Sequence, residues 1–317
     1  MSISRREFVL ASAFAAPIVR TLQLPVDRPI RASARLAVIT DLHHGLAPDA
    51  LTRFDAFLGA VAVRKDLEAV WQLGDFCYSD AGSADCLARW RSVALPRHNV
   101  LGNHDMDKVD KAAAMSAWGM PARYYAAVIG GWRFVVLDLN HYKKDGALHA
   151  YANGNYFAAG VSHNWADPEQ LTWLDREIRA SAEPVVLVSH QPIGLGSSAG
   201  SVPPEQQQVL DVVTNAGRAN PRGRVRCCIS GHLHVDRLEL ADGLPCVCVN
   251  SASYFWSGGM HAYTAPLFAF MEFGTDGTLR IEGRRGAFVA PPPAASDAVV
   301  GRSPSITDRR IQIGIGG

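Results

Sequence analysis

The sequence predicts a layered α/β domain, built on either one mixed sheet or two stacked sheets. The chain has 317 residues, of which 48% are hydrophobic, and this is enough to bury a full core. From residue 35, short apolar runs alternate with amphipathic stretches, as strands alternate with helices in α/β proteins. Past residue 231, short strand patterns follow one another between Gly and Pro turns, which favours antiparallel pairing.

The elements follow in order along the chain. Residues 50–64 have the apolar spacing of a helix. Asp167-Pro168-Glu169-Gln170 predicts a helix start, with Asp as N-cap and Pro in the first turn, and this helix should end near Ala180. Pro203-Pro204-Glu205 predicts another helix, through about Asn215. Buried strands are expected at 36–40, 69–73, 98–101, 132–137, 185–189 and 225–230.

Two segments lack such periodicity. Residues 139–166 are rich in His, Tyr, Asn and Gly and are expected to form an inserted loop. Its histidines and aromatic residues could cover a site and contact a substrate, or the loop could be a simple surface excursion. Residues 286–317, with Pro291-Pro292-Pro293, read as a low-complexity C-terminal tail, either disordered or lying on a partner subunit. The domain itself should therefore span 35–285.

The N-terminus has the features of an export signal. Arg5-Arg6-Glu7-Phe8 precedes a short, Ala-rich apolar stretch, as in twin-arginine signals, which export folded proteins. Ala32-Ser33-Ala34 is a plausible cleavage site, so that 1–34 would be the signal and Arg35 the first mature residue. We therefore expect a periplasmic or secreted protein that meets the export machinery. The alternative is an amphipathic N-terminal helix, and no other segment is apolar enough to span a membrane.

Charge and cysteine content narrow the function classes. The 31 Lys and Arg nearly balance the 30 Asp and Glu, so bulk attraction to nucleic acid or anionic membrane is not expected. No C-x-x-C pair is present, which argues against a zinc ribbon or a redox motif. Export leaves the six cysteines ambiguous: 227–228 and 246–248 could form a disulfide between strands or stay free and buried.

Five short polar motifs follow the predicted strands. Because carboxyl ends of neighbouring strands converge at the ligand crevice of α/β sheets, these motifs should lie together. Carboxylate, imidazole and amide groups without thiolates suit zinc, manganese and iron, and a central Asp such as Asp75 can bridge two ions. A Gly before Asp75, Asn103 and His232 lets the backbone turn sharply. The motifs are Asp41-Leu42-His43, Gly74-Asp75, Gly102-Asn103-His104-Asp105, His190 and Gly231-His232-Leu233-His234.

This ordered set resembles that of the calcineurin-like metallophosphoesterases, over residues 35 to about 285. The resemblance implies a four-layer sandwich of two mixed β-sheets flanked by helices. It also implies two metal ions (Fe, Mn or Zn) and a catalytic histidine, His104, oriented by Asp105. The implied ligands are Asp41, His43, Asp75 and His234 for one ion, and Asp75, Asn103, His190 and His232 for the other.

The resemblance further implies hydrolysis of a small phosphate ester by a metal-bridging hydroxide. Gly-Asn-His-Asp, with Asp rather than Glu, favours a phosphodiesterase over a phosphomonoesterase of the acid-phosphatase kind. A nuclease would use the same ligands, but no run of Lys and Arg offers a track for a polynucleotide. A non-catalytic metal-binding protein of the same fold remains the alternative from another class.

Tyr78 departs from the pattern of the family. Gly74-Asp75-Phe76-Cys77-Tyr78 also fits the Gly-Asp-x-x-Tyr motif of purple acid phosphatases, whose Tyr binds ferric iron. Those enzymes lack the His of the first motif, whereas His43 is present here. We therefore interpret Tyr78 as a packing or substrate-contacting residue.

Overall fold

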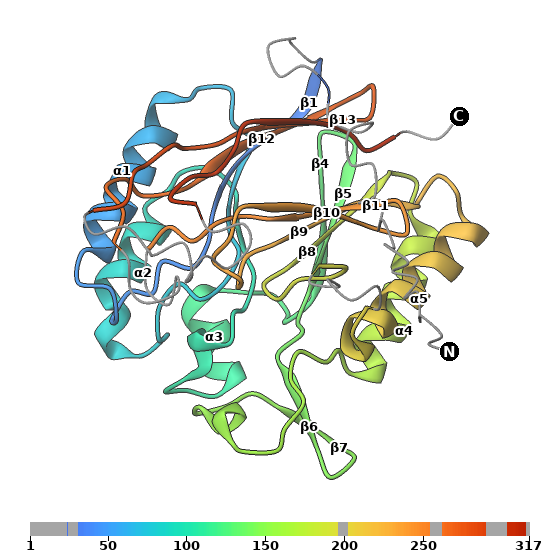
Figure 1. Cartoon of the computed structure of the whole chain (residues 1–317), viewed down its shortest axis with the longest axis horizontal. Helices are drawn as coiled ribbons and strands as arrows, with labels where there is room; N and C mark the ends of the chain where they lie inside the picture. The colour runs from blue at the N-terminus through green and yellow to red at the C-terminus, as the bar shows by residue number, and fades with distance from the viewer. Residues whose placement is uncertain (1–23, 25–30, 196–201, 254–261, 290–302, 315–317) are drawn as a thin grey trace, which may run out of the picture.

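The computed structural model describes residue 24 and residues 31–195, 202–253, 262–289 and 303–314 (Figure 1). Two six-stranded mixed sheets stack face to face, and helices cover the outer face of each. This four-layer arrangement confirms the fold class expected from the sequence.

The first sheet has the order β14-β13-β12-β1-β2-β3. β1, β2 and β3 are parallel neighbours, whereas β12, β13 and β14 continue the sheet in antiparallel pairs. The consecutive strands late in the chain therefore pair as their Gly and Pro turns predicted. The bounds are β1 (Ala32–Ile39), β2 (Ala69–Gln72), β3 (Arg97–Asn99), β12 (Ala269–Gly274), β13 (Thr278–Glu282) and β14 (Arg309–Gln312).

The second sheet has the order β10-β11-β9-β8-β5-β4. Its four central strands are parallel, and the two edge strands, β4 and β10, are antiparallel to their neighbours. The central strands are buried on both faces, which explains their nearly continuous apolar sequences. The bounds are β4 (Tyr125–Ile129), β5 (Trp132–Leu137), β8 (Val185–Ser189), β9 (Val225–Ser230), β10 (Arg237–Ala241) and β11 (Leu244–Cys248).

The helices divide between the two outer faces. Phe54 and Phe57 of α1, Trp90 of α2 and Trp118 of α3 pack against the first sheet. Helices α4 and α5 cover the second sheet, and Asp167 caps α4 by accepting the backbone N–H of Gln170, as its sequence predicted. The bounds are α1 (Ala50–Val63), α2 (Ala84–Arg91), α3 (Lys111–Trp118), α4 (Pro168–Ala180) and α5 (Pro204–Ala219).

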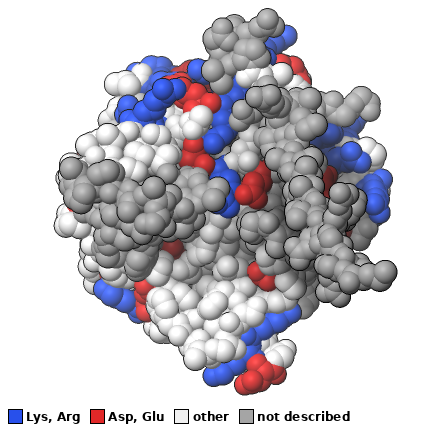
Figure 2. Space-filling view, in the orientation of Figure 1, with Lys and Arg blue, Asp and Glu red and all other residues white. Residues whose placement is uncertain are grey.

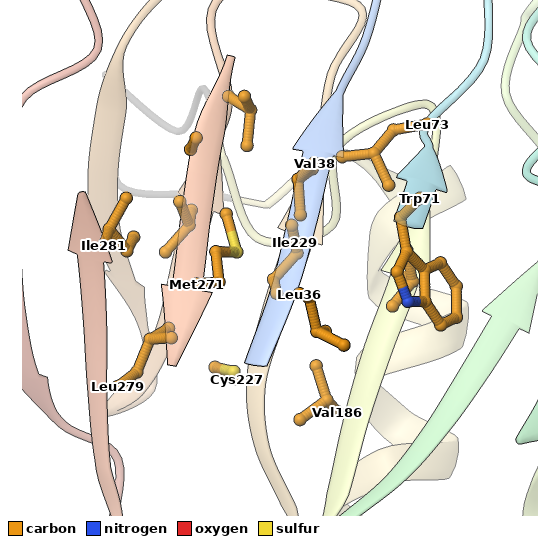
Figure 3. Close-up of a cluster of buried hydrophobic side chains, with 14 of the residues drawn as sticks. Leu36, Val38, Trp71, Leu73, Val186, Cys227, Ile229, Met271, Leu279 and Ile281 are labelled. Carbon is orange, nitrogen blue, oxygen red and sulfur yellow. The ribbon is translucent and has the colours of Figure 1, made fainter. Parts of the chain in front are cut away.

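The main core lies between the two sheets. Leu36 of β1 and Trp71 of β2 project from one sheet, and Val186 of β8 and Ile229 of β9 project from the other (Figure 3). All four side chains are buried. Close packing at this interface fixes the position of one sheet relative to the other. The loops at the strand ends of the two sheets are therefore also fixed relative to one another.

The C-terminal segment differs from the expected tail. Arg309–Gln312 form β14, which pairs with β13, and Ile306, Ile311 and Ile313 belong to the core between the sheets. The expected domain end at residue 285 is therefore wrong for residues 303–314, which complete the first sheet. Local composition hid this strand, because its stability comes from pairing with a distant partner.

The N-terminal boundary also differs. β1 begins at Ala32, inside the expected signal, and Ala32 and Ala34 pair with Gly274 and Phe273 of β12. Ala34 is fully buried. Cleavage after Ala34 would remove the first three residues of a core strand, so this cleavage site conflicts with the fold. The rest of the expected signal lies outside the described residues, apart from Leu24 and Arg31.

The expected loop 139–166 contains a two-stranded hairpin, β6 (His141–Lys144) and β7 (Ala147–Ala150), which projects from the domain (Figure 1). After the hairpin the chain returns to the domain, where Asn153 and Gly154 donate backbone hydrogen bonds to the carbonyl groups of Val109 and Met106. The loop therefore docks beside the third polar motif.

All six cysteines are buried and free. The sequence allowed either a disulfide between strands or free buried cysteines, and the structure has free cysteines. In the described part of the chain, no helix is both long enough and apolar enough to cross a bilayer.

Candidate metal centre

The five polar motifs follow β1, β2, β3, β8 and β9, and the structure brings them to one edge of the sandwich. Each motif starts within four residues of the end of its strand, which places its side chains at the carboxyl edge of the parallel strands. Six of the seven expected metal ligands form two groups with ligand atoms within 4.8 Å of one another in each group.

The first group consists of Asp41, His43 and His234, all buried. His234 Nε2 lies 3.1 Å from both Asp41 Oδ1 and His43 Nε2. Asp41 Oδ2 is already used, because it accepts hydrogen bonds from the Thr40 hydroxyl and the His232 backbone N–H. The remaining oxygen, Oδ1, therefore faces the two imidazoles and is the one available to a metal.

The second group consists of Asp75, His190 and His232. His190 Nε2 lies 3.0 Å from Asp75 Oδ2 and 3.2 Å from His232 Nδ1. His190 Nδ1 is 2.8 Å from the carbonyl oxygen of Leu73, which fixes the ring and directs Nε2 toward the carboxylate. His190 Nε2 is also 3.9 Å from Asp41 Oδ1, so the two groups are adjacent.

The seventh expected ligand, Asn103, lines the same cavity as His232 of the second group. Its Oδ1 atom is buried and has no hydrogen-bond partner, although a buried amide oxygen is normally satisfied. A side-chain oxygen left unpaired beside imidazoles and carboxylates is a donor suited to a metal ion.

The electrostatics of the two groups fit metal cations. Burial lowers the pKa of both His43 and His232 to about 3, so both rings are neutral and can act as ligands. Burial acts against ionisation of Asp41, but His234 and His190 lower its pKa to about 2. For His190, burial lowers the pKa, but Asp75 and Asp41 outweigh it and raise the value to about 9. Two ionised carboxylates buried at this depth need positive charge close by. Metal cations bound by the two groups would supply that charge.

The backbone at the candidate ligands is strained. Five of them have positive φ angles: Asp41 (53°), His43 (51°), Asp75 (50°), His232 (68°) and His234 (51°). A residue with a side chain held in this region costs about 1–3 kcal/mol, and such residues gather at functional sites. The fold therefore maintains an unfavourable local conformation in order to aim these side chains at one point.

The glycines before the ligands allow the strand ends to approach closely. A Cβ atom on Gly102 would lie 2.1 Å from the backbone nitrogen of Asp75, and one on Gly231 would lie 2.2 Å from Thr40 Oγ1. Any side chain at either position would push apart two of the loops that carry ligands. At these two positions glycine serves close packing between loops, rather than the sharp turn expected from the sequence.

His104 is held by a carboxylate, but not by the one expected. Its Nδ1 atom lies 2.8 Å from Asp107 Oδ2 and 3.2 Å from the Tyr156 hydroxyl, which itself donates to Asp107 Oδ1. The assignment of Asp105 as the orienting residue is therefore corrected to Asp107. The available signal was the spacing of three residues, which places both side chains on one face of the helical turn His104–Met106.

Asp105 has a different task. Its carboxylate accepts backbone hydrogen bonds from Gly102, Phe76 and Cys77, and it is fully buried. It thereby ties the loop of the second motif to that of the third. Burial, followed by the nearby charge of Asp75, raises the pKa of Asp105 to about 7.

Tyr78 packs close to His43 and His104, whereas Asn103 lines a separate cavity. Lys108 Nζ is 3.8 Å from the centroid of its ring, and a Cβ on Gly45 would lie 2.8 Å from the ring. Burial raises the pKa of the Tyr78 phenol, which disfavours the ionised form that binds iron. These contacts support the interpretation of Tyr78 as a packing residue.

The histidines of the inserted loop have separate positions. His163 faces a cavity beside Asn103 and His232. His149 stacks on Tyr142 in the hairpin, and His141 Nε2 lies 3.9 Å from Asp167. Of these three, His163 alone lines a cavity at the metal centre. Residues 254–256 and His261, which could form another wall of the site, lie outside the described residues.

A four-layer sandwich that carries two adjacent groups of carboxylate and imidazole ligands at one edge defines a metal-dependent hydrolase of the dinuclear kind. The family model of calcineurin-like phosphoesterases matches residues 34–236. The chain belongs to this family and is a metal-dependent phosphoester hydrolase. The family and the two groups of ligands together indicate two metal ions.

Comparison with solved structures gives one clear match in fold and several weaker similarities. A dimetal phosphatase from Danio rerio is similar with a TM-score of 0.62 and 16% identity, over 89% of this chain and 100% of the other. GAP50, the anchor in the inner membrane complex of Plasmodium, gives a TM-score of 0.48 and 13% identity, over 79% and 84%. Phosphopantetheinyl hydrolase from Mycobacterium tuberculosis gives 0.43 and 18%, over 70% and 91%. No curated protein matches the chain.

Proposed function

We propose that this phosphoester hydrolase acts on phosphodiesters in preference to phosphomonoesters. The observation that carries the proposal is the absence of Lys and Arg from the described residues that line the cavity beside Asn103 and His232, and from those packed around His43, Asp75 and His104. A monoester carries a second negative charge near neutral pH, which favours an additional cationic side chain, whereas a diester carries one charge. Among the described lining residues, histidines are the groups that can carry positive charge, and histidines together with bound metal ions would suit the diester.

The seven candidate ligands would hold the metals in two sets. Asp41, His43 and His234 would bind one ion, His190, His232 and Asn103 would bind the other, and Asp75 would serve both. When bound, the ions supply Lewis-acid activation of the phosphoryl group and of water. The donor set of oxygen and neutral imidazole nitrogen is suited to iron, manganese and zinc.

His104 would donate a proton to the leaving oxygen. Its Nδ1 atom is engaged by Asp107, so Nε2 is the nitrogen that can exchange a proton with a substrate. Burial acts to lower the pKa of His104, but Asp75 and Asp107 outweigh it and raise the pKa, which favours the protonated ring. Asp107 and Tyr156 position the ring by fixing both its orientation and its tautomer.

A polynucleotide substrate is not favoured. Basic and acidic side chains are interspersed on the face shown in Figure 2, and its described part has no continuous basic track. This agrees with the balanced composition of 31 basic and 30 acidic residues. The proposed substrate is therefore a small phosphodiester.

We also propose export to the periplasm or beyond, on the basis of the twin-arginine pattern at Arg5-Arg6. Export in the folded state would let the metals load in the cytoplasm. Because β1 begins at Ala32, cleavage would have to occur upstream of that residue. Secretion of a fusion that carries residues 1–31, and its loss in the Arg5→Lys, Arg6→Lys double variant, would test this.

Turnover of bis(p-nitrophenyl) phosphate and of p-nitrophenyl phosphate by the purified, metal-loaded enzyme tests the main proposal. We expect kcat/KM for the diester to exceed that for the monoester. Asn103→Ala should lower both the metal content and the rate. Faster turnover of the monoester would overturn the diesterase proposal, and full metal content in Asn103→Ala would overturn its assignment as a ligand.

A further inference from the structure

A cavity of about 390 Å³ opens beside two of the candidate ligands, Asn103 and His232. Its volume falls in the range of about 300–1,000 Å³ that is usual for small-molecule sites. The described residues packed around His43, Tyr78 and His104 instead leave no room for a water molecule. A phosphoryl group at the metals therefore has space for a substituent on the Asn103 side. The cavity is lined by Asn103, Tyr151, Tyr156, Phe157, Ala158, His163, Asn164 and His232.

The lining is uncharged and aromatic. None of the described lining residues is Lys, Arg, Asp or Glu. A substituent with its own charge would lose hydration in this cavity without gaining an ionic partner, which is unfavourable. The cavity therefore selects a neutral group.

Phe157 is the exposed end of a stack of aromatic rings. Tyr151 and Tyr156 stack with centroids 4.4 Å apart, and Tyr156 and Phe157 follow at 4.4 Å. Tyr151 and Tyr156 are buried, whereas 66% of Phe157 is exposed. The Phe157 centroid lies 6.0 Å from that of His104. This large apolar ring is therefore accessible to a substrate beside the proposed reacting groups, rather than buried in the core.

The cavity also offers two hydrogen-bonding groups. His163 Nε2 lies 2.7 Å from the carbonyl oxygen of Tyr156, so this nitrogen carries a proton, and in the form of the ring with a single proton Nδ1 is an acceptor. Asn164 Oδ1 accepts from the Tyr151 hydroxyl, which leaves the Nδ2 group as a donor. One donor and one acceptor around an aromatic surface match the edge of a heteroaromatic ring.

We propose that this cavity binds one of the two organic substituents of the phosphodiester, and that this substituent is an uncharged group with an aromatic or heteroaromatic face that stacks on Phe157. The inference rests on the proposed phosphoester hydrolysis, which places the phosphoryl group at the metals. It adds the substrate class and a residue that determines specificity.

Binding of non-hydrolysable phosphonates to the metal-loaded protein, measured by titration calorimetry, tests the proposal. Benzylphosphonate, cyclohexylmethylphosphonate and 2-carboxyethylphosphonate share the head group, but only the first has an aromatic face. We expect benzylphosphonate to bind about three- to tenfold more tightly than the cyclohexylmethyl compound, the gain typical of one aromatic pair. The carboxyethyl compound should bind most weakly. Equal binding of the benzyl and cyclohexylmethyl compounds would overturn the inference.

Variants of the exposed ring make the test specific. Phe157→Ala and Phe157→Leu should each abolish the preference for the benzyl compound, whereas Phe157→Tyr should retain it. Because the ring is 66% exposed, these variants should fold. Val128→Ala, which removes another exposed apolar side chain, is the matched control and should leave the preference unchanged. A benzyl preference that persists in Phe157→Ala would overturn the role of this residue.

The two proposals can fail separately. If the enzyme hydrolyses bis(p-nitrophenyl) phosphate but shows no aromatic preference, the cavity inference is wrong and the activity stands. If phosphonates bind with the expected preference but neither p-nitrophenyl ester is hydrolysed, the cavity inference stands and the proposed reaction is wrong.

Discussion

Replacement of Asp107 by Asn should slow the hydrolysis of esters with poor leaving groups and spare those with good ones. Asp107 Oδ2 lies 2.8 Å from His104 Nδ1, and both side chains are 14% exposed. In Asp107→Asn, an amide that rotates to keep the bond from Tyr156 would direct an N–H group at the protonated Nδ1 of His104. The hydrogen bond between the two residues is then lost.

The size of the effect follows from the type of bond. A hydrogen bond to a charged group contributes about 1.5–3 kcal/mol, which corresponds to roughly 10- to 150-fold in rate if the bond acts fully in the transition state. The loss should appear in kcat for diesters whose leaving group is an alcohol, because these need a proton from His104. For p-nitrophenyl esters, whose leaving group departs as a stable anion, the change should be small.

Steady-state kinetics on both types of ester, with metal content measured in parallel, checks this. Asp80→Asn is the matched control, because Asp80 contributes a solvent-accessible ion pair with Lys108 on the adjacent loop. Asp105→Asn should instead lower stability and metal content and slow both types of ester alike, since Asp105 ties two ligand loops together. Equal losses on both esters in Asp107→Asn, with normal metal content, would refute the assignment of Asp107 to His104.

Three further outcomes follow from the fold. Ile311→Ala should lower the free energy of unfolding by about 2–5 kcal/mol, because Ile311 is fully buried; a change below 1 kcal/mol in chemical denaturation would contradict the place of β14 in the core. A chain that begins at Arg35 should be less stable than one that begins at Ala32, since Ala34 is buried. Equal melting temperatures of the two chains would show that cleavage after Ala34 is compatible with the fold. Burial lowers the pKa of His98 to about 4. The folded state therefore has its full stability with respect to His98 above about pH 6.5, and the free energy of unfolding should fall by about 3 kcal/mol as the pH drops toward 4. His98→Phe should therefore flatten the pH dependence of unfolding in this window, and an unchanged slope would contradict the burial of the neutral ring.

Much of the architecture was readable from local patterns. The strands expected at 132–137, 185–189 and 225–230 match β5, β8 and β9 residue for residue, because these strands are buried on both faces and so have continuous apolar sequences. The helices α2 and α3 were not anticipated. They are only eight residues long and have no proline in the first turn, and a single acidic residue, Asp85 in α2 or Asp110 before α3, is too common a signal to mark a helix by itself.

The C-terminal tail shows the limit of such patterns. β14 is four residues long and follows a proline-rich segment, and the alternation of Ile311 and Ile313 is too short a pattern to establish a strand by itself. It exists because β13 offers it an edge and the core offers a place for Ile311. Local sequence does not encode a distant edge, and for this reason low complexity was a poor guide to the chain after residue 303.

By itself, the sequence determined the family, the fold class and the identity of the seven candidate ligands, since the chemistry of metal binding demands particular side chains at the ends of particular strands. The tertiary structure alone decided which carboxylate holds His104 and where a substituent has room. Asp107 reaches His104 through a helical turn, and Tyr156 reaches it from an inserted loop 52 residues away. Such contacts depend on distances between segments, which only the folded chain fixes.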